Sequence, residues 1–524
     1  MRLASESCCT PGIDPAFRWW IRICLLVPYV YLLAFALLHA GGITVMQDGT
    51  GIFYALYRPV WEGLAGPDLA AAALHWVLPL ALLLMLVTVV QAVDRAGRAT
   101  PAADWLGVAL LALFLFAFAC VTAMMRGGLH GITQAYLRTE TEFTGDLPRF
   151  SSVYDIFHNY LARHRSLTLH ARAYPPGVLA ILHLAGALFG RGALPLSLFT
   201  IGAGAIAVFP LYLLVRDTAG RTTALIACSL YAVMPSVVLF TATSTNALFM
   251  PVIFMTLAAF QRALTTSPVE DAAREDAQPL PAGDGRLQRS DLAWSRRSSA
   301  GTAPGAGEIR KIAGGTASAF LAGGLFAILS LLSFNHLTLG VWFVLAALWP
   351  RRRAGALTAG MKVAALMGVG FLAVHAAVRV GSGFDMLACF KAAKVYFDGC
   401  QAGLTQGPRM ASPWAWRLLI NPAVVLFFAG TPVSVLFVLE VARGRALRSE
   451  VIRCALTFAT LCLLYLARGE AERAAMYMLP FLLLPAAVAL RRLHAHEGPR
   501  PVVAALIMLG VQSWMTEAVL YTYW

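Results

Sequence analysis

The chain has 524 residues, of which 59% are hydrophobic and 13% are charged, and its formal net charge is +14. Soluble globular chains carry about 25% charged residues, so this composition excludes a soluble domain and indicates solvation by lipid. Apolar stretches of about 20 residues recur, each long enough to cross a hydrocarbon core of roughly 30 Å as a helix. Because these runs are continuous rather than alternating, they favour helices over a barrel. We expect an all-α integral membrane protein with about 12–14 transmembrane helices.

The positive charge is concentrated in short loops. Arginines cluster within residues 95–98, 351–353, 443–448 and 491–492. This is the positive-inside pattern, which orients such loops toward the cytoplasm. No basic and aromatic module stands outside the apolar segments, so we expect a multi-pass protein of the plasma membrane with no nucleic-acid partner.

The expected helices divide into two membrane halves. In the N-terminal half, residues 1–262, they are 19–40, 70–93, 104–124, 176–189, 194–215, 222–240 and 246–262. Residues 263–313 are rich in Ala, Gly, Pro, Ser, Asp and Arg, and they predict a disordered cytoplasmic linker. In the C-terminal half, residues 314–524, the expected helices are 316–334, 336–350, 357–380, 422–442, 452–467, 475–490 and 502–521.

Placing the basic loops inside puts the polar segments of the chain outside. These are the large loop 125–175 and the loops 381–421 and 467–474. Counting from the two ends of the chain disagrees by one crossing near residues 175–193. The apolar segment 176–189 is short for a full span, so we expect a tilted, re-entrant or half-crossing helix there.

The large loop carries two acids, Glu142 and Asp146, whose spacing of four places them on one side if the segment is helical. One carboxylate could deprotonate an acceptor hydroxyl as general base while the other tunes its pKa or binds a metal. An ordinary solvated acidic loop fits the spacing equally well. No metal-type Cys/His spacing is present, so a divalent metal is an open possibility without assigned ligands.

Two further pairs of charged residues fall on the same face. Glu470 and Arg473 fit a structural ion pair slightly better than a phosphate grip, although the planar guanidinium suits bidentate phosphate binding. Lys391 and Lys394 share one face of an amphipathic segment, which fits a solvated face better than a lipid-headgroup contact.

Two other polar residues have an ordinary structural interpretation. His170 is more typical of a surface or packing histidine than of a metal ligand. Asn246, which follows Thr-Ala-Thr-Ser-Thr, is also typical of a helix start.

Four segments carry a resemblance to a known family. They are EFTGDLP (142–148), LHARAYPPGVLAILHLAGALFG (169–190), SLYAVMPSVVLFTATSTNALF (229–249) and RGEAERAAMYMLPFLLLP (468–485). Their order resembles the C-type (GT-C) polytopic glycosyltransferases, closest to the protein O-mannosyltransferase-like and RgtA/B/C/D-like branch. Two residues depart from the family pattern: Tyr174 replaces the usual His before Pro-Pro, and Asn246 stands where Asp is common.

The resemblance implies a GT-C-like bundle and a hexosyl- or mannosyltransferase that takes a sugar from a polyprenyl-phosphate donor. Asp146 or Glu142 would remove a proton from the hydroxyl of a glycan, lipid or protein acceptor, and the configuration would invert. Substrate and phosphate would be bound by a set of polar residues: Arg473, Glu470, Arg172, His170, Lys394, Lys391 and Asn246.

The alternative from another class is a polytopic transporter or lipid flippase. Transporters often show two pseudo-symmetric halves and broken helices at the membrane midplane. We find no internal repeat, and the charges gather at one face rather than along a path. A pocket that joins Asp146 to Glu470 and Arg473 would favour the transferase.

Overall fold

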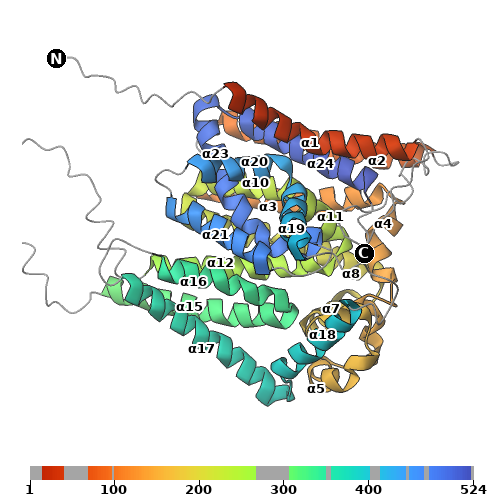
Figure 1. Cartoon of the computed structure of the whole chain (residues 1–524), viewed down its shortest axis with the longest axis vertical. Coiled ribbons are helices and arrows are strands. Elements are labelled where there is room, and N and C mark those ends of the chain that lie inside the picture. Colours follow the sequence, from red (N-terminus) through yellow and green to blue (C-terminus); the bar gives the residue numbers. More distant parts are fainter. Residues whose placement is uncertain are drawn as a thin grey trace, which may run out of the picture.

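The computed structural model describes residues 15–40, 69–96, 100–266, 306–349, 356–401, 414–443, 448–464 and 471–520, and within these ranges all regular structure is helical (Figure 1). The first helices are α1 (Pro15–Ala40), α2 (Leu69–Ala96) and α3 (Pro101–Met124). The large polar loop then holds α4 (Leu129–Leu137), η2 (Phe143–Gly145), η3 (Leu147–Arg149), α5 (Val153–Arg163), η4 (His164–Ser166) and α6 (Leu169–Ala173), where η marks a 3-10 helix.

The rest of the chain is also helical wherever it is described. The first half continues with α7 (Gly177–Phe189), α8 (Ala193–Ile206), α9 (Val208–Ala219), α10 (Arg221–Val233), α11 (Pro235–Thr243), η5 (Thr245–Phe249) and α12 (Met250–Thr265). The second half has α15 (Ala306–Leu332), η6 (Phe334–Leu339), α16 (Gly340–Leu348), α17 (Ala356–Ser382), α18 (Met386–Gln401), α19 (Trp414–Ala429), α20 (Thr431–Arg443), α21 (Arg448–Leu464), α22 (Ala471–Ala474), η7 (Met476–Met478), α23 (Leu479–Glu497) and α24 (Arg500–Val519).

Eight helices of the described ranges are long and apolar enough to span a membrane, or up to ten if each of two bent pairs forms one span. The bent pairs are α10 with α11, at 53°, and residues 421–429 with α20, at 112°. Proline at the start of α11 explains the first break, since it cannot donate the hydrogen bond that would continue α10. The predicted all-α membrane fold is confirmed.

Several predicted helices coincide with shorter apolar segments. Three apolar helical segments of the described ranges are shorter than the 18 residues needed to cross a membrane: 22–34, 177–189 and 334–348. The short helix at 177–189 agrees with the expectation of an incomplete crossing there. Between the halves, α12 ends at Thr265 and α15 begins at Ala306, while most of the predicted linker, residues 267–305, lies outside the described residues.

The helices are arranged around a central group. α23 packs against α10, α20 and α21, and α24 packs against both α1 and α2 at one edge of the bundle (Figure 1). At the opposite edge α15 packs closely on α17, and α12 joins this pair to the centre. The polar loop lies at one end of the bundle, beside α18 and the end of α17 (Figure 1). There His158 Nδ1 is 2.9 Å from the Ser382 carbonyl oxygen.

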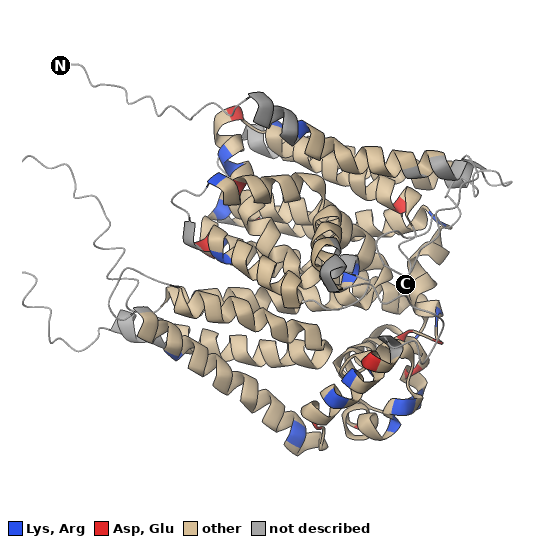
Figure 2. Ribbon diagram, in the orientation of Figure 1, with Lys and Arg blue, Asp and Glu red and all other residues tan. Residues whose placement is uncertain are grey.

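Charged residues are concentrated at the helix ends and on the loop (Figure 2). At the start of α3, Asp104 accepts hydrogen bonds from Tyr212 Oη at 2.7 Å and Arg221 Nε at 2.5 Å. Just after α3 ends, Arg126 Nε is 3.1 Å from the Glu517 carboxylate, near the end of α24. The two ends of α3 are therefore tied to different neighbours, and the Arg126–Glu517 end is the one that leads into the polar loop.

Candidate active site in the polar loop

The two loop acids lie in a tight turn rather than on an α-helix. Glu142 precedes η2, and Asp146 separates η2 from η3. The segment is therefore not an α-helix, and the condition under which the spacing of four would place both acids on one side is not met. Gly145 explains the turn, because a Cβ there would stand 1.8 Å from the Thr139 carbonyl oxygen. A side chain at this position would push the backbone at residue 145 away from Thr139 and move both carboxylates.

Asp146 is fully buried and held on both carboxylate oxygens. Its Oδ2 accepts hydrogen bonds from the Thr168 backbone N–H at 2.8 Å and from the Thr168 hydroxyl at 2.6 Å. Its Oδ1 is 3.3 Å from Arg149 Nε. Hydrogen bonds to a carboxylate are strong, so these contacts fix the chain around Asp146. These contacts tie the start of α6 to the η2–η3 turn.

Glu142 has a different environment. Its side chain is buried, with 7% exposure, and its Oε1 is 3.2 Å from His170 Nε2. The backbone supports this pair, since the His170 N–H donates to the Thr141 carbonyl oxygen at 3.1 Å. The structure thus brings two predicted site residues, Glu142 and His170, into direct contact.

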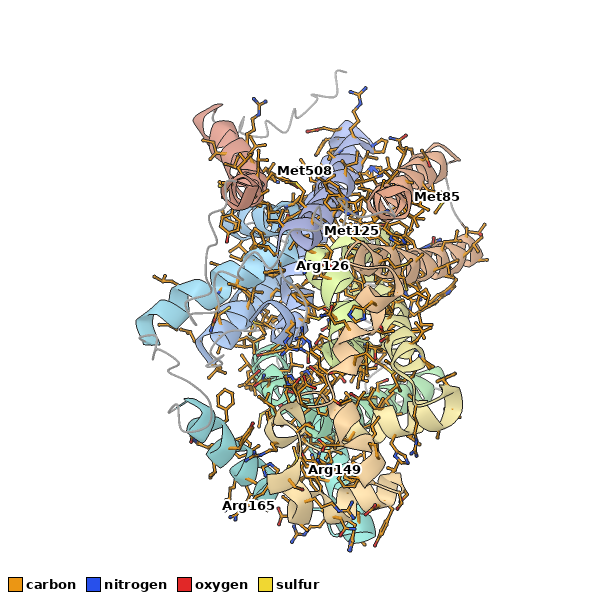
Figure 3. All side chains as sticks on the ribbon, turned by 90° about the vertical axis from the view of Figure 1, so that its right-hand side faces the viewer. Met85, Met125, Arg126, Arg149, Arg165 and Met508 are labelled. Atoms are coloured by element: carbon orange, nitrogen blue, oxygen red, sulfur yellow. The ribbon has the colours of Figure 1, made fainter. Side chains whose placement is uncertain are left out.

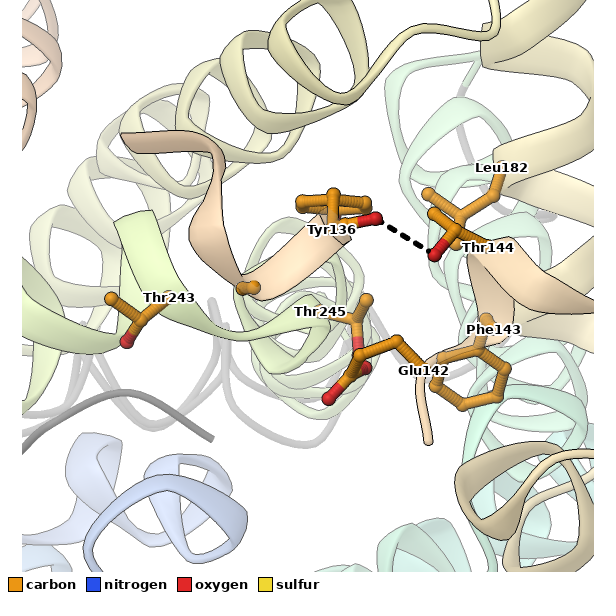
Figure 4. Close-up of a pocket in the computed structure, with 8 residues that line it drawn as sticks. Tyr136, Glu142, Phe143, Thr144, Leu182, Thr243 and Thr245 are labelled. Carbon is orange, nitrogen blue, oxygen red and sulfur yellow. Dashed lines mark hydrogen bonds between the residues drawn. The ribbon is translucent and has the colours of Figure 1, made fainter. Parts of the chain in front are cut away.

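A small pocket, with room for about one water molecule, lies beside Glu142 (Figure 4). Four parts of the chain line it: α4, the η2 turn, α7 and the junction of α11 with η5. The lining residues are Ala135, Tyr136, Glu142, Phe143, Thr144, Leu182, Thr243 and Thr245. Three of the four segments that carry the family resemblance therefore meet at one place. Asp146 and Arg473 are not among the described residues that line this pocket.

Tyr136 and Thr144 close one side of the pocket. The Thr144 hydroxyl donates to the Tyr136 carbonyl oxygen at 3.0 Å, drawn as the dashed line in Figure 4. The Tyr136 hydroxyl forms a short hydrogen bond with Thr200 of α8. Burial raises the pKa of Tyr136, and the neighbouring Glu142 carboxylate raises it further. The phenol therefore remains protonated and anchors α4 to the bundle.

The segment that carries His170 is held in place from α5. The Tyr160 hydroxyl donates to the carbonyl oxygens of Ala171 and Tyr174, the latter at 2.5 Å. His164 Nε2 is 3.0 Å from the Arg172 carbonyl oxygen. Sequence reasoning missed Tyr160, because its partners are backbone atoms 11 and 14 residues away that only the folded loop brings together.

The glycine of Pro-Pro-Gly lets α7 approach a neighbouring helix. A Cβ on Gly177 would stand 2.4 Å from the Leu331 carbonyl oxygen of α15. The motif therefore fixes where α7 starts, and α7 supplies Leu182 to the pocket. The Pro-Pro-Gly sequence is thus explained by the close packing of α7 on α15 as well as by its position next to the pocket.

Other predicted site residues lie apart from Glu142. The Arg172 guanidinium stacks over the ring of Tyr396 in α18, 3.8 Å from its centroid. Lys394 pairs with Asp398 at 2.6 Å, and Lys391 is exposed on the same helix. These three cations therefore belong to the contact between α6 and α18 or to its outer surface.

Asn246 and Arg473 are buried nearer the centre of the bundle. Asn246 lies in η5, next to Thr245 of the pocket, and its backbone N–H donates to Ser244 Oγ at 3.3 Å. Arg473 is 5% exposed on α22, which packs against α11 and α19. Glu470, its predicted partner, lies outside the described residues. Within the described part of the chain, no three His, Cys, Asp or Glu residues form a group that could hold a metal ion.

Residues 173–271 match the family of dolichyl-phosphate-mannose-protein mannosyltransferases. This region runs from the end of α6 through α12 and supplies Leu182, Thr243 and Thr245 to the pocket. The predicted resemblance is confirmed. No curated protein sequence matches the chain.

Several solved structures are similar to the chain at low identity. ArnT from Cupriavidus metallidurans, in the apo state, has 12% identity and a TM-score of 0.40, with 71% of this chain and 73% of that chain covered. The Archaeoglobus fulgidus oligosaccharyltransferase in complex with Zn and sulfate has 16% identity and a TM-score of 0.35, with 66% and 45% covered. The archaeal oligosaccharyltransferase AglB from Archaeoglobus fulgidus, in complex with an inhibitory peptide and a dolichol-phosphate, has 14% identity and a TM-score of 0.35, with 78% and 56% covered. The chain thus spans about half the length of these archaeal chains.

Proposed function

We propose that the protein is a membrane glycosyltransferase that moves a sugar, mannose or another hexose, from a polyprenyl-phosphate donor to an acceptor hydroxyl at the outer face of the plasma membrane. The observation that carries this proposal is the meeting of three family-like segments at the pocket beside Glu142. The family match over residues 173–271 supports the reaction class. A transporter or flippase is not favoured, because the buried acids of the described residues lie near helix ends or in the polar loop rather than along a path through the bundle.

Glu142 is the residue we assign as general base, in place of the open choice between Glu142 and Asp146. Its carboxylate lines the pocket, whereas Asp146 does not line it, accepts two hydrogen bonds from Thr168 on Oδ2 and faces Arg149 with Oδ1. In the reaction, the acceptor oxygen attacks the anomeric carbon as Glu142 takes its proton. The bond from that carbon to the phosphate oxygen breaks, and the phosphate leaves with the electron pair. A single displacement of this kind inverts the configuration.

The departing phosphate needs a cation in a dry environment. We assign this role first to Arg473, because it is buried and its helix packs against α11, which supplies Thr243 to the pocket. A guanidinium stabilises a developing phosphate charge strongly where water is excluded. Arg172, Lys391 and Lys394 would then act at the surface around α18, where a glycan, lipid or protein acceptor or the donor's headgroup approaches.

The test compares Glu142→Gln with the matched control Glu140→Gln, an exposed acid two residues away. Membranes containing each variant are incubated with labelled polyprenyl-phosphate mannose and an extract of acceptor lipids, glycans and proteins. Loss of a general base lowers the rate by about 10²–10⁴-fold, so we expect this loss for Glu142→Gln and wild-type transfer for Glu140→Gln. Wild-type transfer by Glu142→Gln would contradict the assignment of the base. Absence of transfer by the wild type from all polyprenyl-phosphate hexoses would contradict the reaction class.

A further inference from the structure

A groove lies on the outer surface of α24, where that helix begins. It is lined by Gln91 of α2 and by Pro499, Arg500, Val503, Ala504 and Ile507, and its volume is about 370 Å³. Positions 500, 503, 504 and 507 follow the spacing of one helix face. The Arg500 guanidinium therefore lies at one end of an apolar row formed by Val503, Ala504 and Ile507. Ala504 and Ile507 are exposed, and the row runs toward the middle of the helix.

Arg500 differs from the other arginines near it. Arg491 donates to the Ala219 carbonyl oxygen at 3.0 Å, and Arg492 lies 2.8 Å from the Glu440 carboxylate. Arg500 is exposed and forms no hydrogen bond or ion pair with the residues that the structure describes. None of the lining residues is acidic. The guanidinium is thus available to an anion at the mouth of the groove.

The groove and the candidate active site lie at opposite ends of the bundle. Glu517, near the end of α24, is joined to Arg126, which leads into the polar loop. Arg500 is 17 residues earlier on the same helix, about 25 Å away along its axis. In Figure 3 Arg149 and Arg165 of the polar loop also lie well below Met85 of α2 and Met508 of α24, so these parts are separated sideways across the bundle as well.

We propose that this groove binds an anionic phospholipid of the leaflet opposite the active site. Arg500 and the Gln91 amide would hold the lipid phosphate, and an acyl chain would lie along Val503, Ala504 and Ile507. The planar guanidinium suits phosphate, and the positive-inside pattern places this end at the cytoplasmic leaflet, whose lipids are anionic. A donor that reacts at the Glu142 pocket has its phosphate at the other end of the bundle, so the occupant is a membrane phospholipid. The exclusion of the donor rests on the proposed function, whereas the groove and its exposed cation do not.

The experiment measures lipid retained by the purified full-length protein after exchange into mixed micelles of phosphatidylglycerol and phosphatidylcholine, by native mass spectrometry. Arg500→Gln removes the charge, and Ala504→Phe fills the groove while leaving the charge. Arg443→Gln is the matched control, since it removes an exposed arginine at the end of α20 that does not line the groove. Thermal unfolding of each variant checks that it is folded.

We expect the wild type to retain phosphatidylglycerol in preference to phosphatidylcholine, and Arg500→Gln to retain about fivefold less, since one arginine near a membrane surface contributes about 1 kcal/mol. Ala504→Phe should lose retention to a similar degree, and Arg443→Gln should retain as much as the wild type. Equal loss in Arg443→Gln would mean general charge attraction and overturn the site. Undiminished retention in either groove variant would overturn it as well. Displacement of phosphatidylglycerol by equimolar polyprenyl phosphate would identify the donor as the occupant and overturn the phospholipid assignment.

Discussion

At the polar loop, Glu142 lies beside a pocket with His170 as its basic neighbour, whereas at the other end of α3 the carboxylate of Asp104 is held by Tyr212 and Arg221. Both side chains are buried, so burial alone does not distinguish them. What differs is whether donors surround the oxygens or one side faces open space. A carboxylate that faces a pocket can exchange a proton with a ligand, and one surrounded by donors ties helices together.

Asp146 shows that contacts outweigh position in the chain. It is four residues from Glu142, yet its bonds to Thr168 and Arg149 resemble those of Asp104. We therefore expect the two loop acids to respond differently to substitution: Glu142 through the rate of transfer, as proposed above, and Asp146 through the stability of the loop. Three further predictions test this division.

The largest stability effect is expected for Asp146→Ala. The change leaves the Thr168 N–H and hydroxyl buried without their acceptor, and hydrogen bonds to a charged group contribute about 1.5–3 kcal/mol. We expect the free energy of unfolding to fall by about 3 kcal/mol, with faster hydrogen exchange in residues 139–173. Thermal unfolding in micelles and exchange mass spectrometry measure the two effects. A variant that unfolds like the wild type but transfers no sugar would instead place Asp146 among the catalytic residues.

Asp104→Ala should produce a smaller loss without a local effect on the loop. The change removes the acceptor of Tyr212 and Arg221, but the Arg221 side chain is 44% exposed and water can replace part of the bond. We expect a loss of about 2 kcal/mol in the free energy of unfolding. Hydrogen exchange should increase at the start of α3 and α10 and remain unchanged in residues 139–173. If Asp104→Ala lowered the rate of sugar transfer as strongly as Glu142→Gln, the distinction between a structural Asp104 and a catalytic Glu142 would be wrong.

Much of the fold was predictable, because membrane helices follow from the lengths of apolar runs. The polar loop and three of the four segments that meet at the pocket were also visible as motifs. The roles of Glu142 and Asp146 were not. A spacing of four residues is meaningful only on an α-helix, and the chain around Gly145 forms two 3-10 turns instead. Thr243 was overlooked as a lining residue for a similar reason: an apolar run ending in small polar residues does not show what packs across from it.

Residues that position the site were the hardest to predict. Tyr160 acts through backbone oxygens of α6 and its end, and Tyr396 acts by stacking on Arg172 from a helix more than 200 residues later. A backbone acceptor cannot be recognised in a sequence, since every residue has the same carbonyl group. The stacking of a ring on a distant side chain does not depend on residue spacing either. These contacts require the tertiary structure.

The smallest effect concerns the pH dependence of the loop through His164. Burial lowers the pKa of His164 below its usual 6.5, so the folded loop binds fewer protons at this residue than the unfolded chain. The contribution of His164 to the free energy of unfolding is therefore complete above about pH 6.5, the pKa of the unfolded chain. It is lost as the pH falls from there toward the lower pKa of the folded loop. We expect His164→Gln, whose amide can still donate to the Arg172 carbonyl oxygen, to flatten this slope by less than about 1 kcal/mol between pH 7 and pH 5.

Hydrogen exchange of residues 153–174 at several pH values measures the slope, with His158→Gln as the matched control. His158 is exposed on the adjacent helix and also contacts a backbone carbonyl, so its replacement should leave the slope unchanged. A slope that persists in His164→Gln would assign the pH dependence to another group of the loop.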